Sequence, residues 1–200
     1  MTTTHTPETL RAFTASIAEA FNNGTISGPV HLSGGNEEQL CELFRDVGPD
    51  DYVFSTYRSH YHALLRGVPE AELRAEIMAG RSITLQFPAF RFLTSAIVAG
   101  HLPIAVGVAL QIKRQGGKER VWCFLGDMAE ATGLYAECTR YAGGWGLPIT
   151  FVVEDNGVSV CTPTNDTWRS GESCESGPTF KYYDYTLPWP HAGGKKRTNF

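Results

Sequence analysis

The chain has 200 residues, of which 42% are hydrophobic and 19% are charged, and its formal net charge is −4. This length corresponds to about one domain of ordinary size. The charge balance argues against nucleic acid or an anionic membrane as a partner, and no apolar run approaches the roughly 20 residues of a membrane span.

The cysteines and the N-terminus bear on the cellular compartment. The five cysteines include no CxxC pair, and three of them lie in apolar or helical stretches, which favours buried, reduced thiols. Residues 1–10 lack the charged start and apolar core of a secretory signal. We therefore expect a cytoplasmic protein.

The spacing of apolar residues predicts secondary structure along most of the chain. The predicted elements are a helix over residues 6–21, a helix over 36–47, a strand over 51–56, a helix over 69–80, an aromatic loop over 81–95 and a buried helix over 99–117. From about residue 161 onward the chain is polar, then aromatic, then basic, without a clear helical period.

Two continuous apolar runs, "VWCFL" (121–125) and "ITFVV" (149–153), flank one more helix-length segment. Such runs are typical of parallel strands that are buried on both faces. The segment therefore predicts a β-α-β unit, right-handed by default, in a parallel α/β sheet.

Polar residues follow both of these strands directly. Asp127 comes after the first strand and Asn156 after the second. Ligands of parallel sheets bind beyond the carboxyl ends of the strands, where a carboxylate and a carboxamide oxygen suit Mg²⁺ or Ca²⁺. Gly126 permits a tight turn into the helix, whose free N–H groups at Met128 and Ala129 would face a phosphate. Gly-Asp and Asp-Asn are also common turn dipeptides, so a plain turn is the alternative.

The same residues resemble a known motif. A Gly-Asp after a strand, with an Asn 29 positions after the Asp, is similar to the thiamine diphosphate motif. The chain resembles the alpha subunit of two-subunit 2-oxoacid dehydrogenases (pyruvate, branched-chain and acetoin types). The resemblance also includes "GPVHLSGGNEEQ", "YRSHYHALLRG" and "AIVAGHLPIAVGVALQIK", and runs from about Gly28 to Thr164. It implies a doubly wound, thiamine-diphosphate-binding fold.

The resemblance implies a metal and diphosphate site. Asp127, Asn156 and the backbone carbonyl of Val158 would bind Mg²⁺, while Asp155 stands where the family usually has Asn. Tyr57 and Arg58 would reach the diphosphate, since a guanidinium can donate two parallel hydrogen bonds to it. A surface ion pair is the alternative for the arginine.

Further roles follow from the same resemblance. His31 and His60 would line the active site and move protons, whereas a structural role is favoured for the remaining histidines of the core, His5, His62 and His101. The carbonyl of Ala96 and the N–H of Val98 would hold the aminopyrimidine ring, with the Val98 side chain wedging the two rings of the cofactor. Core packing is the alternative for this segment.

The chain also departs from the family. The loop whose histidine serves lipoyl transfer is replaced by "GRSITLQ" (80–86), and the region after the Asn is short. We expect a single diphosphate-binding domain over 1–200, made of an N-terminal helix (1–27), a family-like core (28–164) and a divergent tail (165–200). In the tail, "FKYYDYT" could add a strand and His191 could cover the diphosphate, or the basic end could be solvated.

The predicted function is that of an alpha-type subunit of a thiamine-diphosphate- and Mg²⁺-dependent enzyme. It would decarboxylate a 2-oxoacid and transfer the acyl carbanion to an acceptor. The partner would be a beta-type subunit with the pyrimidine-binding domain and its activating glutamate, in an α2β2 heterotetramer. The alternatives are a split transketolase-like ketol transfer on a ketose, and a non-catalytic cofactor-binding or regulatory subunit.

Overall fold

A computed structural model describes residues 5–168, 179–191 and 199–200. The elements are, in chain order, α1 (Pro7–Asn22), α2 (Glu37–Leu43), β1 (Tyr52–Ser55), α3 (His60–Leu65), α4 (Glu70–Met78), β2 (Gln86–Phe87), the 3₁₀ turn η1 (Pro88–Phe90), β3 (Phe92–Thr94), α5 (Leu102–Gln115), β4 (Val121–Gly126), α6 (Asp127–Glu130), α7 (Gly133–Trp145), β5 (Ile149–Asp155), β6 (Val158–Ser159), β7 (Thr162–Pro163), α8 (Thr164–Trp168) and β8 (Phe180–Asp184).

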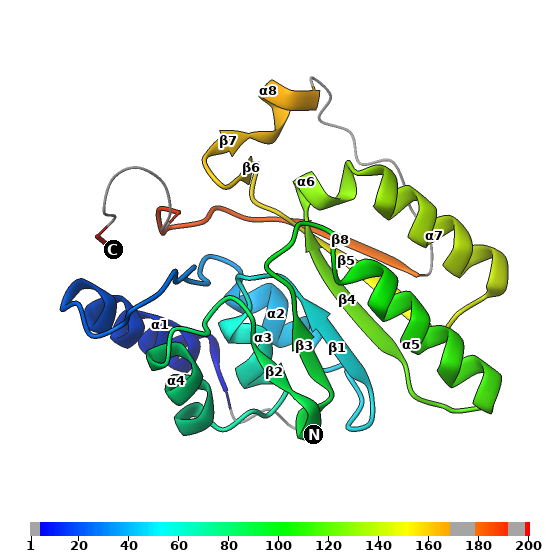
Figure 1. Cartoon of the computed structure of the whole chain (residues 1–200), viewed down its shortest axis with the longest axis horizontal. Helices are drawn as coiled ribbons and strands as arrows, with labels where there is room; N and C mark the ends of the chain where they lie inside the picture. Colours follow the sequence, from blue (N-terminus) through cyan, green and yellow to red (C-terminus); the bar gives the residue numbers. More distant parts are fainter. Residues whose placement is uncertain (1–4, 169–178, 192–198) are drawn as a thin grey trace.

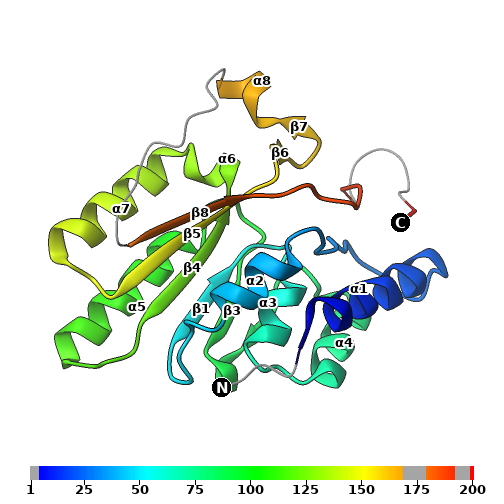
Figure 2. The ribbon, with the colours of Figure 1, turned by 180° about the vertical axis from the view of Figure 1, so that it is seen from behind.

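The architecture is a doubly wound α/β sheet, as predicted. Six strands lie in the order β2-β3-β1-β4-β5-β8. All neighbours pair in parallel except the edge pair β2 and β3, which is antiparallel. Helices α1 to α4 cover one face of the sheet, and α5 and α7 cover the other (Figures 1 and 2).

Alternation along β4 shows why both faces are buried. Trp122 and Phe124 belong to the core cluster shared with α1 to α4, whereas Cys123 and Leu125 belong to the cluster shared with α5 and α7. All four side chains are 0% exposed. A strand between two helical layers must be apolar at every position, so the continuous run predicted its place correctly.

Residues 81–95 do not form the loop that we expected. Phe92–Thr94 forms β3, which pairs in parallel with β1 and continues the sheet. Its partner β2 is only Gln86–Phe87. Strands this short carry no readable alternation, and Phe92 is buried by the sheet contact rather than by a local pattern. Helix α3 was also not predicted, because it is only 6 residues long.

The described part of the tail is attached to the body. Strand β8 pairs with β5 in parallel, which confirms the added strand predicted from "FKYYDYT". The next residues cross the loop before α2. There Gly35 has φ +86, and a Cβ on it would lie 2.0 Å from the Thr186 carbonyl oxygen. At the C-terminus, the Phe200 N–H donates to Asn22 Oδ1 at 2.9 Å.

The cysteines of the described chain are unpaired. Cys123 and Cys138 are buried, as predicted, while Cys161 is exposed. Burial raises the pKa of both buried thiols, which keeps them protonated. Within residues 5–168, 179–191 and 199–200, no helix is both long and apolar enough to cross a membrane.

Candidate diphosphate and metal site

A cavity lies at the carboxyl ends of the parallel strands. After β1 the chain continues through helices on one face of the sheet to β3, which lies on one side of β1. After β3 it continues through α5 on the other face to β4, which lies on the opposite side of β1. Ligands of such sheets bind at this point, where the strand order reverses. The residues that line the cavity are Ser33, Asn36, Thr56, Tyr57, Arg58, Ser95, Ile97, Val98, Ala99, His101, Gly126, Asp127, Met128, Ala129, Glu154, Asn156, Val158, Ser159 and Tyr185.

Asp127 is the first residue after β4 and opens the short helix α6. Gly126 is its extended N-cap, with φ −88 and ψ 165. The Asp127 side chain is buried, and Thr164 Oγ1 donates a hydrogen bond to Oδ2. Burial raises the pKa of Asp127, and the negative charge of Asp155 raises it further. A buried carboxylate in this situation is stabilised by a cation.

Asn156 faces the same cavity from the end of β5. Its Oδ1 accepts from the Val158 N–H at 3.1 Å, and its Nδ2 donates to Tyr185 Oη at 3.2 Å. Gly157, between Asn156 and Val158, has φ +71, a backbone angle that residues with a side chain rarely adopt. The cavity therefore receives a carboxylate and a carboxamide oxygen from neighbouring strands. Among the described residues, no three His, Cys, Asp or Glu side chains form a metal-binding group, so a cation here would need carboxamide and carbonyl ligands beside Asp127.

The β1 side of the cavity is positively charged. Arg58 Nη1 donates to the Leu32 carbonyl at 2.5 Å, which fixes the guanidinium at the cavity wall. Burial lowers the pKa of Arg58, as expected for a cation shielded from water. Tyr57 also lines the cavity and packs against His31, with 4.6 Å between ring centroids. An anion in the cavity would compensate the buried charge.

The predicted catalytic histidines are not among the lining residues. His31 is buried beside Tyr57 and stacks on His191 at 4.2 Å. Burial, followed by the positive field of His191 and Arg58, lowers the pKa of His31 to about 3. His60 is 0% exposed, and its Nε2 lies 2.8 Å from Ser82 Oγ. The structure thus places His31 and His191 against Tyr57 of the cavity wall, and His60 in a fully buried position beside Ser82.

The segment predicted to hold a pyrimidine ring is largely exposed. Val98 and Ile97 line the cavity mouth with 44% and 73% of their surface exposed, and Ala96 is exposed without lining it. Of the histidines expected to be structural, His62 and His101 are buried in the core, whereas His5 is half-buried. His101 Nε2 lies 2.7 Å from the Phe124 carbonyl, and His62 Nε2 lies 3.1 Å from Glu154 Oε2.

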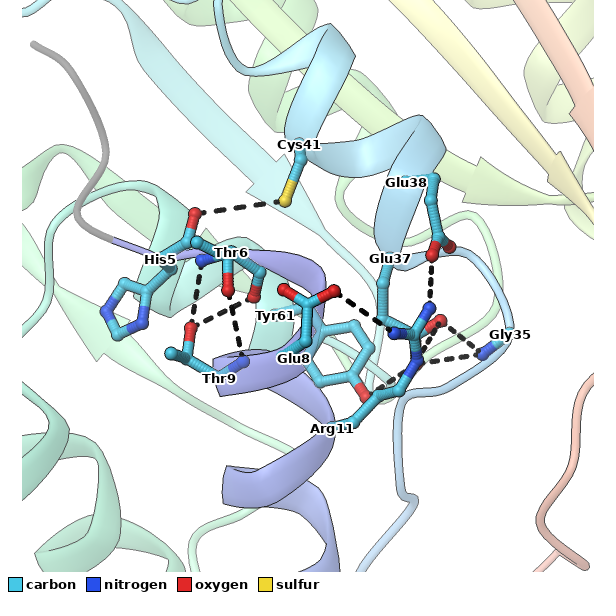
Figure 3. Close-up of polar contacts among 10 residues, drawn as sticks. All are labelled: His5, Thr6, Glu8, Thr9, Arg11, Gly35, Glu37, Glu38, Cys41 and Tyr61. Atoms are coloured by element: carbon cyan, nitrogen blue, oxygen red, sulfur yellow. Dashed lines mark hydrogen bonds and ion pairs between the residues drawn. The ribbon is translucent and has the colours of Figure 1, made fainter.

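The sequence did not reveal the polar network that begins at Asn36 and Glu154 of the cavity wall. Glu154 is 6% exposed, accepts from Asn36 Nδ2 at 3.0 Å and also accepts from the Tyr183 hydroxyl. Glu37 supports the adjacent loop by accepting from the Gly35 N–H at 3.2 Å and from Tyr61 Oη at 2.9 Å (Figure 3). In the sequence, this network is indicated only by the glutamate near the end of the apolar strand "ITFVVED".

The remaining sequence-predicted positions of the tail fall in two groups. His191 is described and stacks on His31. The basic end of the tail, Lys195, Lys196 and Arg197, lies outside the described residues.

The fold and the cavity define a doubly wound α/β protein with a polar ligand site, part acidic and part basic, at the carboxyl edge of its sheet. Residues 5–181 match the dehydrogenase E1 component family, and the chain belongs to that family.

Curated relatives agree with this family. The chain is 35% identical over 163 residues to the pyruvate dehydrogenase E1 component subunit alpha of Porphyra purpurea, an alignment that covers 73% of this chain and 47% of that protein. It is 30% identical over 177 residues to the alpha subunit of the acetoin:2,6-dichlorophenolindophenol oxidoreductase of Bacillus subtilis, with coverage of 84% and 52%. The chain thus spans about half the length of these relatives.

Among solved structures, the chain is similar to a thiamin diphosphate-dependent enzyme from Mycobacterium smegmatis, with a TM-score of 0.42 and 21% identity. That similarity covers 58% of this chain and 20% of the other.

Proposed function

We propose that the chain is the diphosphate-binding, alpha-type subunit of a thiamine-diphosphate- and Mg²⁺-dependent enzyme acting on 2-oxoacids. One observation carries this proposal: Asp127, Asn156 and Arg58 reach one cavity from the ends of three parallel strands. Hard oxygen donors on one side and a buried guanidinium on the other match a divalent cation bound to a diphosphate.

The charge of the residues supports this fit. The Asp127 carboxylate is buried with a raised pKa, and Arg58 is shielded from water with a lowered pKa. Each carries a charge that costs free energy to bury alone, so each favours a ligand of opposite sign. Asp127, Asn156 and the Val158 carbonyl would hold Mg²⁺, and Tyr57 and Arg58 would hold the phosphates. The N–H groups of Met128 and Ala129 would add donors beside Gly126.

Thiamine diphosphate supplies, when bound, an electron sink for breaking or forming a bond next to a carbonyl group. The work of this chain is to bind the charged end, to orient it and to shield it from water. The candidates for holding or moving a proton are His31 and His191, which pack against Tyr57, and the buried His60. The exposed apolar mouth at Val98 would contact the ring end of the cofactor, with the Ala96 carbonyl as the acceptor for its amine.

The proposal includes a partner subunit. The pyrimidine-binding domain and its activating glutamate would come from a beta-type chain, in an α2β2 assembly. The wide exposure of Ile97 and Val98 at the cavity mouth supports a site that a second chain completes. The segment that replaces the lipoyl-transfer loop, residues 80–86, contains no histidine, which favours transfer to a small acceptor, as in ketol transfer. A non-catalytic cofactor-binding subunit remains the second candidate.

Calorimetry with thiamine diphosphate tests the metal site. We expect binding to the full chain with Mg²⁺ and none with excess chelator, because two phosphates facing Asp127 need a cation between them. Asp127→Ala should abolish the Mg²⁺-dependent signal. The matched control is Asp166→Ala on the exposed helix α8, which should bind like the parent chain. Equal affinity in Asp127→Ala would exclude this assignment, and turnover by the chain without any partner would exclude the split site.

A further inference from the structure

Two tyrosines of β8 and the tyrosine that follows it contact the last two residues of β5 and Asn156, which comes next. Parallel pairing sets Glu154 opposite Tyr183 and Asp155 opposite Asp184. The Tyr183 hydroxyl donates to Glu154 and the Tyr182 hydroxyl donates to Asp155. The Tyr185 hydroxyl accepts from Asn156 Nδ2 at 3.2 Å. Each polar residue of "EDN" thus has its own phenol from "YYDY".

Tyr185 differs from the other two tyrosines because it belongs to the cavity wall. Tyr185 lines the cavity together with Asn156, whereas Tyr182 and Tyr183 do not line it. Its backbone N–H donates to the Asp155 carbonyl at 2.8 Å, which continues the strand pairing and fixes where the ring begins. The phenol therefore has a defined position relative to the Asn156 side chain.

The hydrogen bond to Tyr185 orients the Asn156 carboxamide. Only the oxygen of a carboxamide has a lone pair for a cation, so the side chain must present Oδ1 and not Nδ2. The Val158 N–H donates to Oδ1 on one side, and the Tyr185 hydroxyl accepts from Nδ2 on the other. Removing the phenolic oxygen leaves the amide held at one end only, and rotation about the last side-chain bond becomes easier.

We propose that Tyr185 is a positioning residue for the metal site: its hydroxyl holds the Asn156 carboxamide with the oxygen toward the cavity. This inference rests on the proposed function and adds to it a residue from the divergent tail. The added strand β8 then does more than extend the sheet, because the residue that follows it sets the geometry of the ligand that follows β5.

Electron paramagnetic resonance of Mn²⁺ titrated into the full chain with thiamine diphosphate measures the metal affinity directly, without turnover. Loss of one neutral hydrogen bond corresponds to about three- to tenfold weaker Mn²⁺ binding in Tyr185→Phe. Tyr182→Phe removes a hydroxyl from the adjoining strand β8 that does not line the cavity, and should stay within about twofold of the parent chain. Circular dichroism of the same samples verifies that each variant is folded.

A double-mutant cycle separates positioning from a general effect on the fold. A carboxylate has two equivalent oxygens, so in the Asn156→Asp background the orientation no longer matters. There we expect Tyr185→Phe to change the Mn²⁺ affinity by less than about twofold. An equal loss in both backgrounds, or no loss in either, would overturn the positioning role. Absence of Mn²⁺ binding by the parent chain would instead overturn the proposed function itself.

Discussion

The close approach between the tail and the loop before α2 leads to a quantitative prediction about Gly35. Replacing Gly35 by Ala adds a Cβ only 2.0 Å from the Thr186 carbonyl oxygen, and contacts under 3.0 Å essentially do not occur. The two backbones must therefore separate by about 1 Å, and such overpacking typically costs about 1–3 kcal/mol. The positive φ of +86 adds a further ~1 kcal/mol for any residue other than glycine.

Gly67 provides the matched control for this substitution. It has φ +95, but a Cβ there would meet nothing within 4 Å. Urea denaturation should give Gly67→Ala only the backbone cost of ~1 kcal/mol, and Gly35→Ala about 1–3 kcal/mol more. Since Thr186 lies between β8 and His191, Gly35→Ala should also weaken thiamine diphosphate binding. Equal free energies of unfolding in the two variants would refute the packing of the tail on this loop.

Three more predictions follow from the contacts of the core and the tail. Asp51 accepts from Trp122 Nε1 at 3.0 Å at the far end of the sheet, so Asp51→Ala should lower the free energy of unfolding in urea by about 2–4 kcal/mol without changing cofactor affinity. Burial lowers the pKa of His60 to about 3 from 6.5. Below pH 6.5 the unfolded chain therefore binds a proton that the folded chain does not, and the free energy of unfolding falls as the pH drops. His60→Gln should reduce this dependence of the free energy of unfolding on pH by up to ~1.4 kcal/mol per pH unit. Truncation after Tyr185 should raise the thiamine diphosphate concentration needed for half-maximal activity several-fold, with His191→Ala reproducing part of the loss; normal turnover at limiting cofactor would mean that the tail does not cover the site.

The sequence predicted the parts of the fold that a local pattern determines. The runs at 121–125 and 149–153 are almost entirely apolar because both faces of β4 and β5 are covered; the one polar residue, Thr150, is buried and accepts from Arg120 Nη2 at 3.0 Å. Once these strands were recognised, the position of Asp127 and Asn156 at one edge followed from parallel pairing. Their convergence on one cavity could therefore be predicted before any side chain was placed.

Other features depend on contacts between distant parts of the chain. Phe92 becomes part of a strand because it lies opposite Val53, which its own neighbours do not encode. His60 was predicted to line the site, but it is fully buried, is not among the lining residues and contacts Ser82 instead. Tyr185 contacts Asn156 only because β8 adds to the sheet with one particular register. A local pattern carries no information about such pairings.

A crystal structure of the chain with Mg²⁺ and thiamine diphosphate tests the central claim most directly. We expect a cation at about 2.0–2.1 Å from oxygens of Asp127, Asn156 and the Val158 carbonyl, with two further oxygens from the diphosphate. The Arg58 guanidinium should face the same diphosphate. A cofactor bound elsewhere, or a cation that touches neither Asp127 nor Asn156, would contradict it.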